Sequence, residues 1–262
     1  MLRQMQDRYA GDVGDFGKYG CLRQLLRAGQ CDGLSLGVVW YKTRHEFQNN
    51  DGKHVGYLRA DGDARRRFRE CDCKLYDGLK VIVEGGRRKL RAIEDSGLLG
   101  DRVRFFGATL ECGGGSRKQR EARREAWVTA ALSHIKDCDV VFLDPDNGVG
   151  PAPLKCSQRM APKYAMLEEC ARFSLGGRRS IVVYQHADRT RPVEEQIRWN
   201  LRRLRTVSPR AGRPIALRFR RGTSRAFLVL PSKEHEDLFR ARAREMVAGP
   251  WGKHKHFELI EP

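Results

Sequence analysis

The feature that most constrains the fold is the regular alternation of short apolar runs with segments of helical periodicity. LSLGVVWY (34–41), DVVFLD (139–144) and SIVVYQH (180–186) are rich in β-branched and aromatic residues, which is typical of buried strands. Between them lie longer segments in which leucine, isoleucine and valine recur at helical spacing. Strands that alternate with helices predict a mainly parallel sheet with helices on both faces.

The last part of the chain has a different pattern. PIALRFRRGTSRAFLVLP (214–231) alternates apolar and polar residues around a glycine-containing turn, as an antiparallel hairpin does. We therefore expect a three-layer, doubly wound α/β fold with a C-terminal antiparallel hairpin. The 262 residues are expected to form a single domain, with a charged surface insertion around residues 59–75.

The charge of the chain indicates a polyanionic partner. Lysine and arginine number 51 against 33 aspartate and glutamate residues, which gives a net charge of +18. Phosphate contacts by arginine and lysine release counterions and supply most of the sequence-independent affinity for nucleic acid. DNA is therefore the predicted partner, RNA remains open, and a basic surface that serves only solubility is the plain alternative.

Cysteine usage and hydropathy bear on the location of the protein. The eight cysteines are scattered, without the CxxC pairs and histidine spacing of zinc sites. The chain opens without the apolar core of a signal peptide, and no run approaches the length of a membrane span. We expect a cytoplasmic protein with reduced thiols, no membrane partner and no metal; the oligomeric state is left open.

Polar residues follow three of the predicted strands directly. WYKTRHEFQNNDGKH follows the first strand, DPDNG begins at Asp144, and YQHADR begins at Tyr184. A fourth segment, YAGDVGDFGKYG (9–20), is interpreted as a glycine-rich loop that enters a helix near Lys18. Ligands of open α/β sheets bind outside the carboxyl ends of the strands. We therefore expect the four segments to meet in one crevice.

The residue types in these segments suggest roles. The predicted catalytic residues are Asp12, Asp144, Asp146 and Asn147. The predicted substrate-binding residues are Asp15, Lys18, Tyr19, Asn50, Asp51, His54, Tyr184 and His186. The residues predicted to bind the nucleic-acid backbone are Arg198, Arg202, Arg218, Arg220 and Arg225. Two adjacent carboxylates would differ in pKa, so that one is ionised at neutral pH while the other can act as an acid.

Each motif also has an ordinary structural explanation. DPDNG and NNDG contain the residues that turns prefer. Asp12 can cap a helix without binding a ligand, and His186 can be a hydrogen-bonded core residue. The arginines in VEEQIRWNLRRLRT (193–206) can form the solvated face of an amphipathic helix. The functional prediction therefore depends on the convergence of the four segments.

The order of motifs resembles that of the adenine methyltransferases that act on DNA or rRNA. A GDxGDxxK segment, a helix, a first strand, a DPxx strand end and a terminal hairpin follow one another over the greater part of the chain. The resemblance implies S-adenosylmethionine as cofactor, with residues 144–147 holding the target amino group. Asp146 and Asn147 stand where that family has its second proline and an aromatic residue, and no glycine-rich turn follows the first strand.

The residue types at the strand ends also resemble those of uracil-DNA glycosylases. Those enzymes carry a water-orienting aspartate in a DPY strand end, an asparagine that holds the base and a histidine from a later strand end. Asp144, Asn147 and His186 occur here in the same order, without the full motifs GQDPYH and HPSPLS. The resemblance implies DNA as substrate, hydrolysis without a cofactor and a role in phage defence.

The predicted reaction is hydrolysis of the N-glycosidic bond of a flipped-out, modified base. A carboxylate steadies the oxocarbenium-like sugar or orients water, and Asn147, Lys18 or a histidine takes up charge on the leaving base. Three alternatives remain at this stage. They are methylation of a base with S-adenosylmethionine, cleavage of nucleic acid by a Mg²⁺-dependent nuclease, and nucleic-acid binding without catalysis.

Overall fold

A single mixed sheet forms the centre of the molecule. The computed structural model describes residues 9–27, 33–43, 52, 54–111, 113–188 and 191–262, and within them the strand order is β2-β1-β3-β6-β8-β7-β9. The parallel strands are β1 (Leu36–Trp40), β2 (Val103–Phe106), β3 (Val140–Asp144) and β6 (Ser180–His186). The antiparallel part is formed by β7 (Ile215–Phe219), β8 (Arg225–Leu230) and β9 (Phe257–Ile260). The predicted α/β class with a C-terminal hairpin is confirmed.

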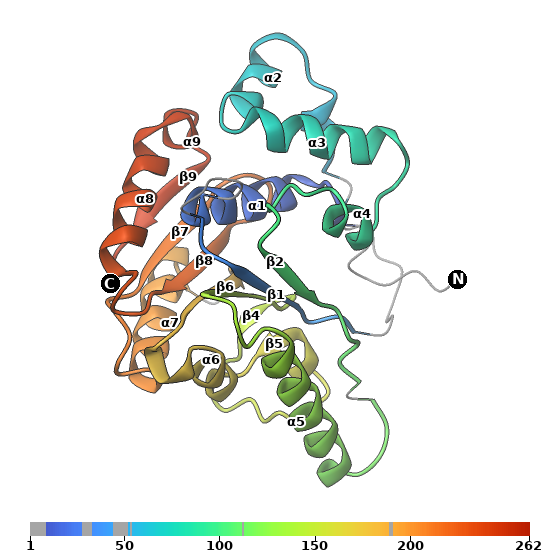
Figure 1. Ribbon diagram of the computed structural model, residues 1–262, viewed down its shortest axis with the longest axis vertical. Helices are drawn as coiled ribbons and strands as arrows, with labels where there is room; N and C mark the ends of the chain where they lie inside the picture. The colour runs from blue at the N-terminus through green and yellow to red at the C-terminus, as the bar shows by residue number, and fades with distance from the viewer. Residues whose placement is uncertain (1–8, 28–32, 44–51, 53, 112, 189–190) are drawn as a thin grey trace.

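Helices cover both faces of this sheet (Figure 1). One face carries α1 (Val13–Leu26), α3 (Cys73–Glu84), α4 (Leu90–Glu94) and α8 (Glu236–Ala248). The other carries α5 (Arg117–His134), α6 (Leu167–Phe173) and α7 (Val193–Val207). Successive strand residues point to opposite faces, so Val140 and Phe142 of β3 join the first core while Val141 and Leu143 join the second. The two cores explain why β3 is apolar from Val140 to Leu143.

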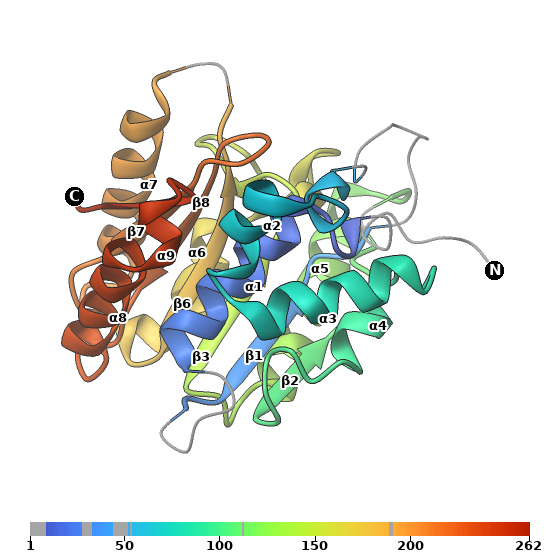
Figure 2. The ribbon, with the colours of Figure 1, turned by 90° about the horizontal axis from the view of Figure 1, so that it is seen from above.

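The segment interpreted from sequence as a glycine-rich loop is mostly helix, so that interpretation was wrong. α1 begins at Val13, and the N-cap Asp12 accepts a hydrogen bond from the Asp15 backbone at 3.0 Å. Glycine disfavours an isolated helix, but close tertiary packing outweighs that preference here. A Cβ on Gly17 would lie 2.7 Å from the Phe219 ring, and one on Gly20 would lie 2.3 Å from Trp251. The glycines therefore let α1 approach Phe219 of β7 and Trp251 closely. On the face of the sheet, α1 lies between α3 and α8 (Figure 2).

Three other segments add detail that the sequence pattern did not show. Residues 59–75 contain α2 (Gly62–Arg69), which has no buried residue, and the first turn of α3. Residues 161–173 form η3 (Ala161–Lys163), β5 (Tyr164–Ala165) and α6, and β5 pairs with β4 (Gly148–Val149). Beyond the hairpin, β9 extends the sheet by pairing with β7.

In the part of the chain that the structure describes, no helix has both the length and the apolar character of a membrane span.

The glycine packing of α1 leads to a stability prediction. Alanine favours an isolated helix by about 1 kcal/mol over glycine, yet Gly17→Ala is expected to lower the free energy of unfolding by about 1–3 kcal/mol because its methyl group overpacks against Phe219. Urea unfolding measures the change. Gly56→Ala is the matched control, since its Cβ would meet nothing within 4 Å. Wild-type stability of Gly17→Ala would contradict the close approach.

Candidate functional site

The candidate site lies where the strand order of the sheet reverses. β1 pairs in parallel with β2 on one side and with β3 on the other, and Trp40 at the end of β1 is in register with Asp144 at the end of β3. Such a switch point, outside the carboxyl ends of the strands, is where doubly wound sheets bind ligands. α1 leads back into β1, so its first turns lie at this same edge. Asp144 and the start of α1 thus share one location.

A buried cluster of charges joins these two elements. Lys18 Nζ lies 2.8 Å from Asp144 Oδ2 and 3.2 Å from Asp15 Oδ1. Lys18 and Asp144 are 9% and 8% exposed, and Asp15 is 2% exposed. The second oxygen of Asp15 accepts a hydrogen bond from the Gly11 backbone at 3.1 Å. One ammonium therefore serves two carboxylates in a nearly solvent-free environment.

Burial and charge act in opposite directions on this cluster. Burial raises the pKa of Asp15 from 3.8 to about 6; Lys18 opposes this effect, while Asp12 and Asp144 add to it. Burial likewise raises the pKa of Asp144, against the influence of Lys18. Burial alone would lower the pKa of Lys18, but Asp144 and Asp15 raise it well above its ordinary value. Lys18 is therefore a fixed cation, and its amine is not available as a nucleophile.

Aromatic and polar groups of β1, β6 and β8 border the cluster. Lys18 Nζ lies 5.6 Å from the Trp40 ring centre and 5.8 Å from that of Tyr184, within the range of cation–π attraction. The Tyr184 hydroxyl accepts a hydrogen bond from Arg225 Nε at 3.1 Å and lies 3.4 Å from His186 Nδ1. These contacts connect the charged cluster to the end of β6.

The backbone of the DPDNG turn is held from both sides. Asn147 donates its N–H to the Lys163 carbonyl at 2.9 Å, and its own carbonyl accepts from the His186 N–H and from Gln185 Nε2, both at 3.2 Å. Gln185 Oε1 also accepts from the Val149 N–H at 3.0 Å. Gly148 has a φ of +109°, and a Cβ there would lie 2.4 Å from Gln185 Oε1. The turn thus needs glycine at this position, and the Gln185 amide fixes its path.

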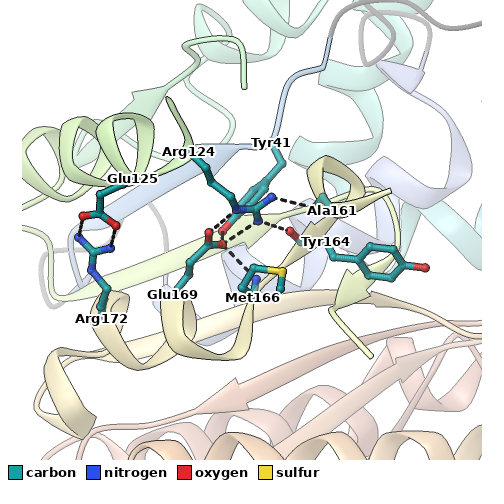
Figure 3. A network of polar contacts seen from close by, with 8 residues as sticks. All are labelled: Tyr41, Arg124, Glu125, Ala161, Tyr164, Met166, Glu169 and Arg172. Carbon is teal, nitrogen blue, oxygen red and sulfur yellow. Dashed lines mark hydrogen bonds and ion pairs between the residues drawn. The ribbon is translucent and has the colours of Figure 1, made fainter. Parts of the chain in front are cut away.

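A second buried ion pair anchors the chain beyond the turn (Figure 3). Arg124 of α5 contacts Glu169 of α6 through Nε at 2.5 Å and Nη2 at 3.0 Å, and it also donates to the carbonyls of Ala161 and Tyr164. Glu169 additionally accepts from the Tyr41 hydroxyl at 3.2 Å. This network is structural, and it attaches the chain after DPDNG to α5, α6 and the end of β1.

The structure brings together most of the sequence-predicted residues of the four segments. The charged cluster contains Asp12, Asp15, Lys18 and Asp144. The contacts described above link it to Tyr184, His186 and Asn147. Asp146 and Asn147 are half-buried, and thus more accessible than Asp144. Tyr19 is fully buried in the core. The His54 carbonyl accepts from the Val13 N–H, which places His54 at the start of α1, whereas Asn50 and Asp51 lie outside the described residues.

The predicted backbone-binding arginines lie on α7 and on the β7–β8 hairpin. Arg225 is buried against Tyr184 at the candidate site. Arg218 and Arg220 both donate to Glu258, at 2.8 and 3.0 Å, and Arg198 donates to Glu194 at 2.8 Å. Arg202 is exposed on α7. Their role in phosphate binding stays a prediction; Arg218, Arg220 and Arg225 lie on the β7–β8 hairpin, whose turn is at the same edge of the sheet as the end of β6.

Several residues that shape the site escaped the sequence analysis. Gln185 lies within the polar strand end YQHADR but was given no role, and Lys163 lies outside the four segments. Their importance comes from contacts with a turn 38 and 16 residues away in sequence. Gly148 carried a weak signal, since glycine at the end of DPDNG is typical of a positive φ. The Arg124–Glu169 pair carried none, because charged residues on predicted helices are usually exposed.

An ammonium group occupies the centre of the charged cluster. Among the residues with described positions, no group of three or more His, Cys, Asp or Glu side chains is arranged to hold a metal ion, and the Lys18 ammonium lies between the carboxylates of Asp15 and Asp144. The six cysteines in the described ranges are free thiols. No protein-family model matches the chain, and no curated protein matches it significantly.

The raised pKa of Asp15 leads to a prediction for stability against pH. The folded state binds this proton more tightly than the unfolded state does, so this carboxyl lowers the free energy of unfolding as pH rises from about 4 to about 6. Asparagine does not titrate, so Asp15→Asn removes this fall in the free energy of unfolding. The variant should gain stability relative to the wild type between pH 4 and pH 7, by about 1.4 kcal/mol for each pKa unit of the shift.

Urea unfolding at a series of pH values measures this difference. Asp77→Asn is the control, because the hydrogen bond from Arg69 lowers the pKa of Asp77 on the surface, and its removal changes relative stability in the opposite direction. A difference between Asp15→Asn and wild type that stays constant with pH would refute the assigned shift.

The turn itself supplies a third prediction. Gly148→Ala combines a positive φ with a collision against the Gln185 amide, and we expect the free energy of unfolding to fall by about 1–3 kcal/mol. Gly150→Ala in the same segment is the control, since its Cβ would approach no atom closer than 3.3 Å and its φ is ordinary. Equal stability of the two variants would mean that Gln185 does not fix the turn.

Proposed function

We propose that the protein is an enzyme that takes a base out of the nucleic-acid stack and hydrolyses its N-glycosidic bond. The observation that carries the proposal is the buried contact of Lys18 with Asp144 at the switch point of the sheet, 2.8 Å in length. Breaking the glycosidic bond places positive charge on the sugar and negative charge on the base. A carboxylate and a fixed cation side by side can stabilise these two charges. Modified DNA is the proposed substrate, with release of the free base.

The two reacting halves need charges of opposite sign. As the bond between the sugar C1′ and the base nitrogen breaks, the bonding electrons stay with the base and positive charge develops on the sugar. Asp144 is proposed to stabilise that positive charge, and the more accessible Asp146 to orient a water molecule and accept its proton. Lys18 and the Asn147 side chain are the donors proposed to stabilise the departing base. The water oxygen then forms the new bond to C1′.

The surroundings of the cluster support this chemistry. Asp144 and Lys18 are almost fully buried, and a low dielectric strengthens electrostatic stabilisation of a transition state. The rings of Trp40 and Tyr184 lie within 6 Å of the ammonium. A flipped base costs a few kcal/mol of lost stacking, which contacts in an enclosed pocket offset. The net charge of +18 is consistent with a nucleic-acid substrate.

Base methylation is the second candidate, and one observation favours it. Lys18 of the GDxGDxxK segment meets the DPxx strand end at the switch point, which is the layout that resembles adenine methyltransferases. The chain does not supply the usual elements that hold a nucleoside cofactor in this fold class. Residues 41–51 after β1 contain no glycine, and β2 is followed by Gly107, Ala108, Thr109 and Leu110 in place of an acidic residue. For this reason we place hydrolysis first.

The reaction can be tested with DNA that carries diverse modifications, including modified phage genomes. Purified protein without added cofactor or metal is expected to release bases, so that strand breaks appear after alkali treatment and not before. Labelled methyl transferred from S-adenosylmethionine would support the second candidate instead. Breaks that need Mg²⁺ and no alkali, or no change in any DNA, would overturn glycosidic hydrolysis.

A variant pair tests the assignment of Asp144. Asp144→Asn is expected to reduce base release by about 10²-fold or more. It should still fold, since Lys18 keeps Asp15 as a partner at 3.2 Å. Asp137→Asn, at an exposed carboxylate paired with Arg104, is the control and should leave the rate unchanged. Full activity of Asp144→Asn would remove this residue from the catalytic set.

A further inference from the structure

The segment after DPDNG forms a strap beside the candidate site. We use "strap" for residues 151–163, PAPLKCSQRMAPK. The Lys163 carbonyl at its end accepts the Asn147 N–H at 2.9 Å, and the flanking strands β4 and β5 pair with each other. Both ends of the strap are therefore held next to the turn that carries Asp144, Asp146 and Asn147.

The charge of the strap has one sign. It contains Lys155, Arg159 and Lys163 and no acidic residue, and the first two side chains are exposed. The neighbouring first turns of α5 add further cations, and the carboxylate of Glu121 there is paired with Arg117 at 2.8 Å. This cationic surface lies at the carboxyl edge of the sheet. The turn of the β7–β8 hairpin lies at the same edge, and Arg218 and Arg220 there both contact Glu258.

The strap is also held in a defined conformation. Arg120 Nε donates to the Ser157 carbonyl at 2.9 Å. Arg124 Nη1 donates to the Ala161 carbonyl at 2.9 Å, as Figure 3 shows. Turns within the strap close through bonds such as Leu154 N–H to the Pro151 carbonyl at 2.8 Å. Three prolines restrict its backbone further. A surface fixed in this way can bind a ligand with little loss of conformational entropy.

One apolar side chain stands out on the strap. Met160 is 48% exposed, and in the described parts of the chain only Val81 and Leu175 share this class of large exposed hydrophobic residue. It lies between Arg159 and the anchored Ala161. Proteins that unstack or extrude bases insert apolar side chains between base steps while cations bind the adjacent phosphates.

We propose that the strap is the element that docks the nucleic acid and opens its stack. Lys155, Arg159 and Lys163 bind successive phosphates of the strand that carries the target nucleotide, and Met160 enters the space that the extruded base leaves. The proposal rests on the proposed action on a flipped base. It adds where the duplex binds and which side chain replaces the base.

Binding to a fluorescent 20-base-pair duplex tests the cationic part without relying on catalysis. The variant Lys155→Gln/Arg159→Gln/Lys163→Gln is expected to raise Kd about tenfold or more at moderate salt. The slope of log K against log salt should become shallower by about 0.9 for each phosphate that the variant no longer binds. The matched control, Lys136→Gln/Arg178→Gln/Arg210→Gln, removes three exposed cations that precede β3, β6 and β7, at the opposite edge of the sheet, and should bind as the wild type does. Unchanged binding by the strap variant, or an equal weakening in the control, overturns the proposal.

Met160 is tested with a duplex that contains one abasic position. Met160→Ala should weaken binding to this duplex several-fold relative to single-stranded DNA, and Met160→Leu should restore it. Leu175→Ala, at an exposed apolar residue on another surface, is the control. If Met160→Ala binds the abasic duplex as tightly as the wild type does, insertion of Met160 is refuted.

The two proposals can fail separately. Loss of DNA binding in the strap variant without base release by the wild type would leave the strap as a docking surface and refute the reaction. Base release that persists unchanged in the strap variant would support the reaction and refute the strap.

Discussion

The buried contact between Lys18 and Asp144 is the interaction on which the rest of the site depends. It joins residues 126 positions apart in sequence at 2.8 Å, with both side chains almost excluded from water. Desolvation of each ion costs several kcal/mol, and the contacts of Lys18 with Asp144 and Asp15 offset that cost. α1 must therefore lie close to the sheet, and the glycines that face Phe219, Trp251 and Arg225 allow that approach.

The chain beyond Asp144 is also held in place by buried contacts. The turn that follows has its backbone hydrogen bonds supplied by Gln185 and by the Lys163 carbonyl, and the positive φ of Gly148 leaves room for the Gln185 amide. The Arg124–Glu169 pair then fixes the path from the strap into α6. A carboxylate and an amide held by a satisfied hydrogen-bond network are preorganised, and preorganised charge is more effective in stabilising a transition state than mobile charge.

The distribution of charge refines what the net value of +18 suggests. Many arginines bind carboxylates or carbonyl groups inside the fold, among them Arg23 with Asp72 and Arg124 with Glu169. Their charge stabilises the structure and contributes little to an external field. Exposed cations on acid-free segments, such as the strap, are better placed to attract a polyanion. Composition alone does not separate these two groups of arginines.

The sequence by itself determined the class of the fold and the position of the polar strand ends. Strand and helix periodicities are local, and they predicted β1, β3, β6, α7 and the hairpin of β7 and β8. The rule that parallel strands share a carboxyl edge predicted that Asp12, Asp15, Lys18 and Asp144 converge. Only the tertiary structure decided that the glycine segment is helical, that Lys18 lies between two carboxylates, that Gln185 holds the turn and that β9 extends the sheet. These features arise from contacts between distant segments, and burial, ion pairing and close backbone approach there outweigh the local preferences that a sequence pattern records.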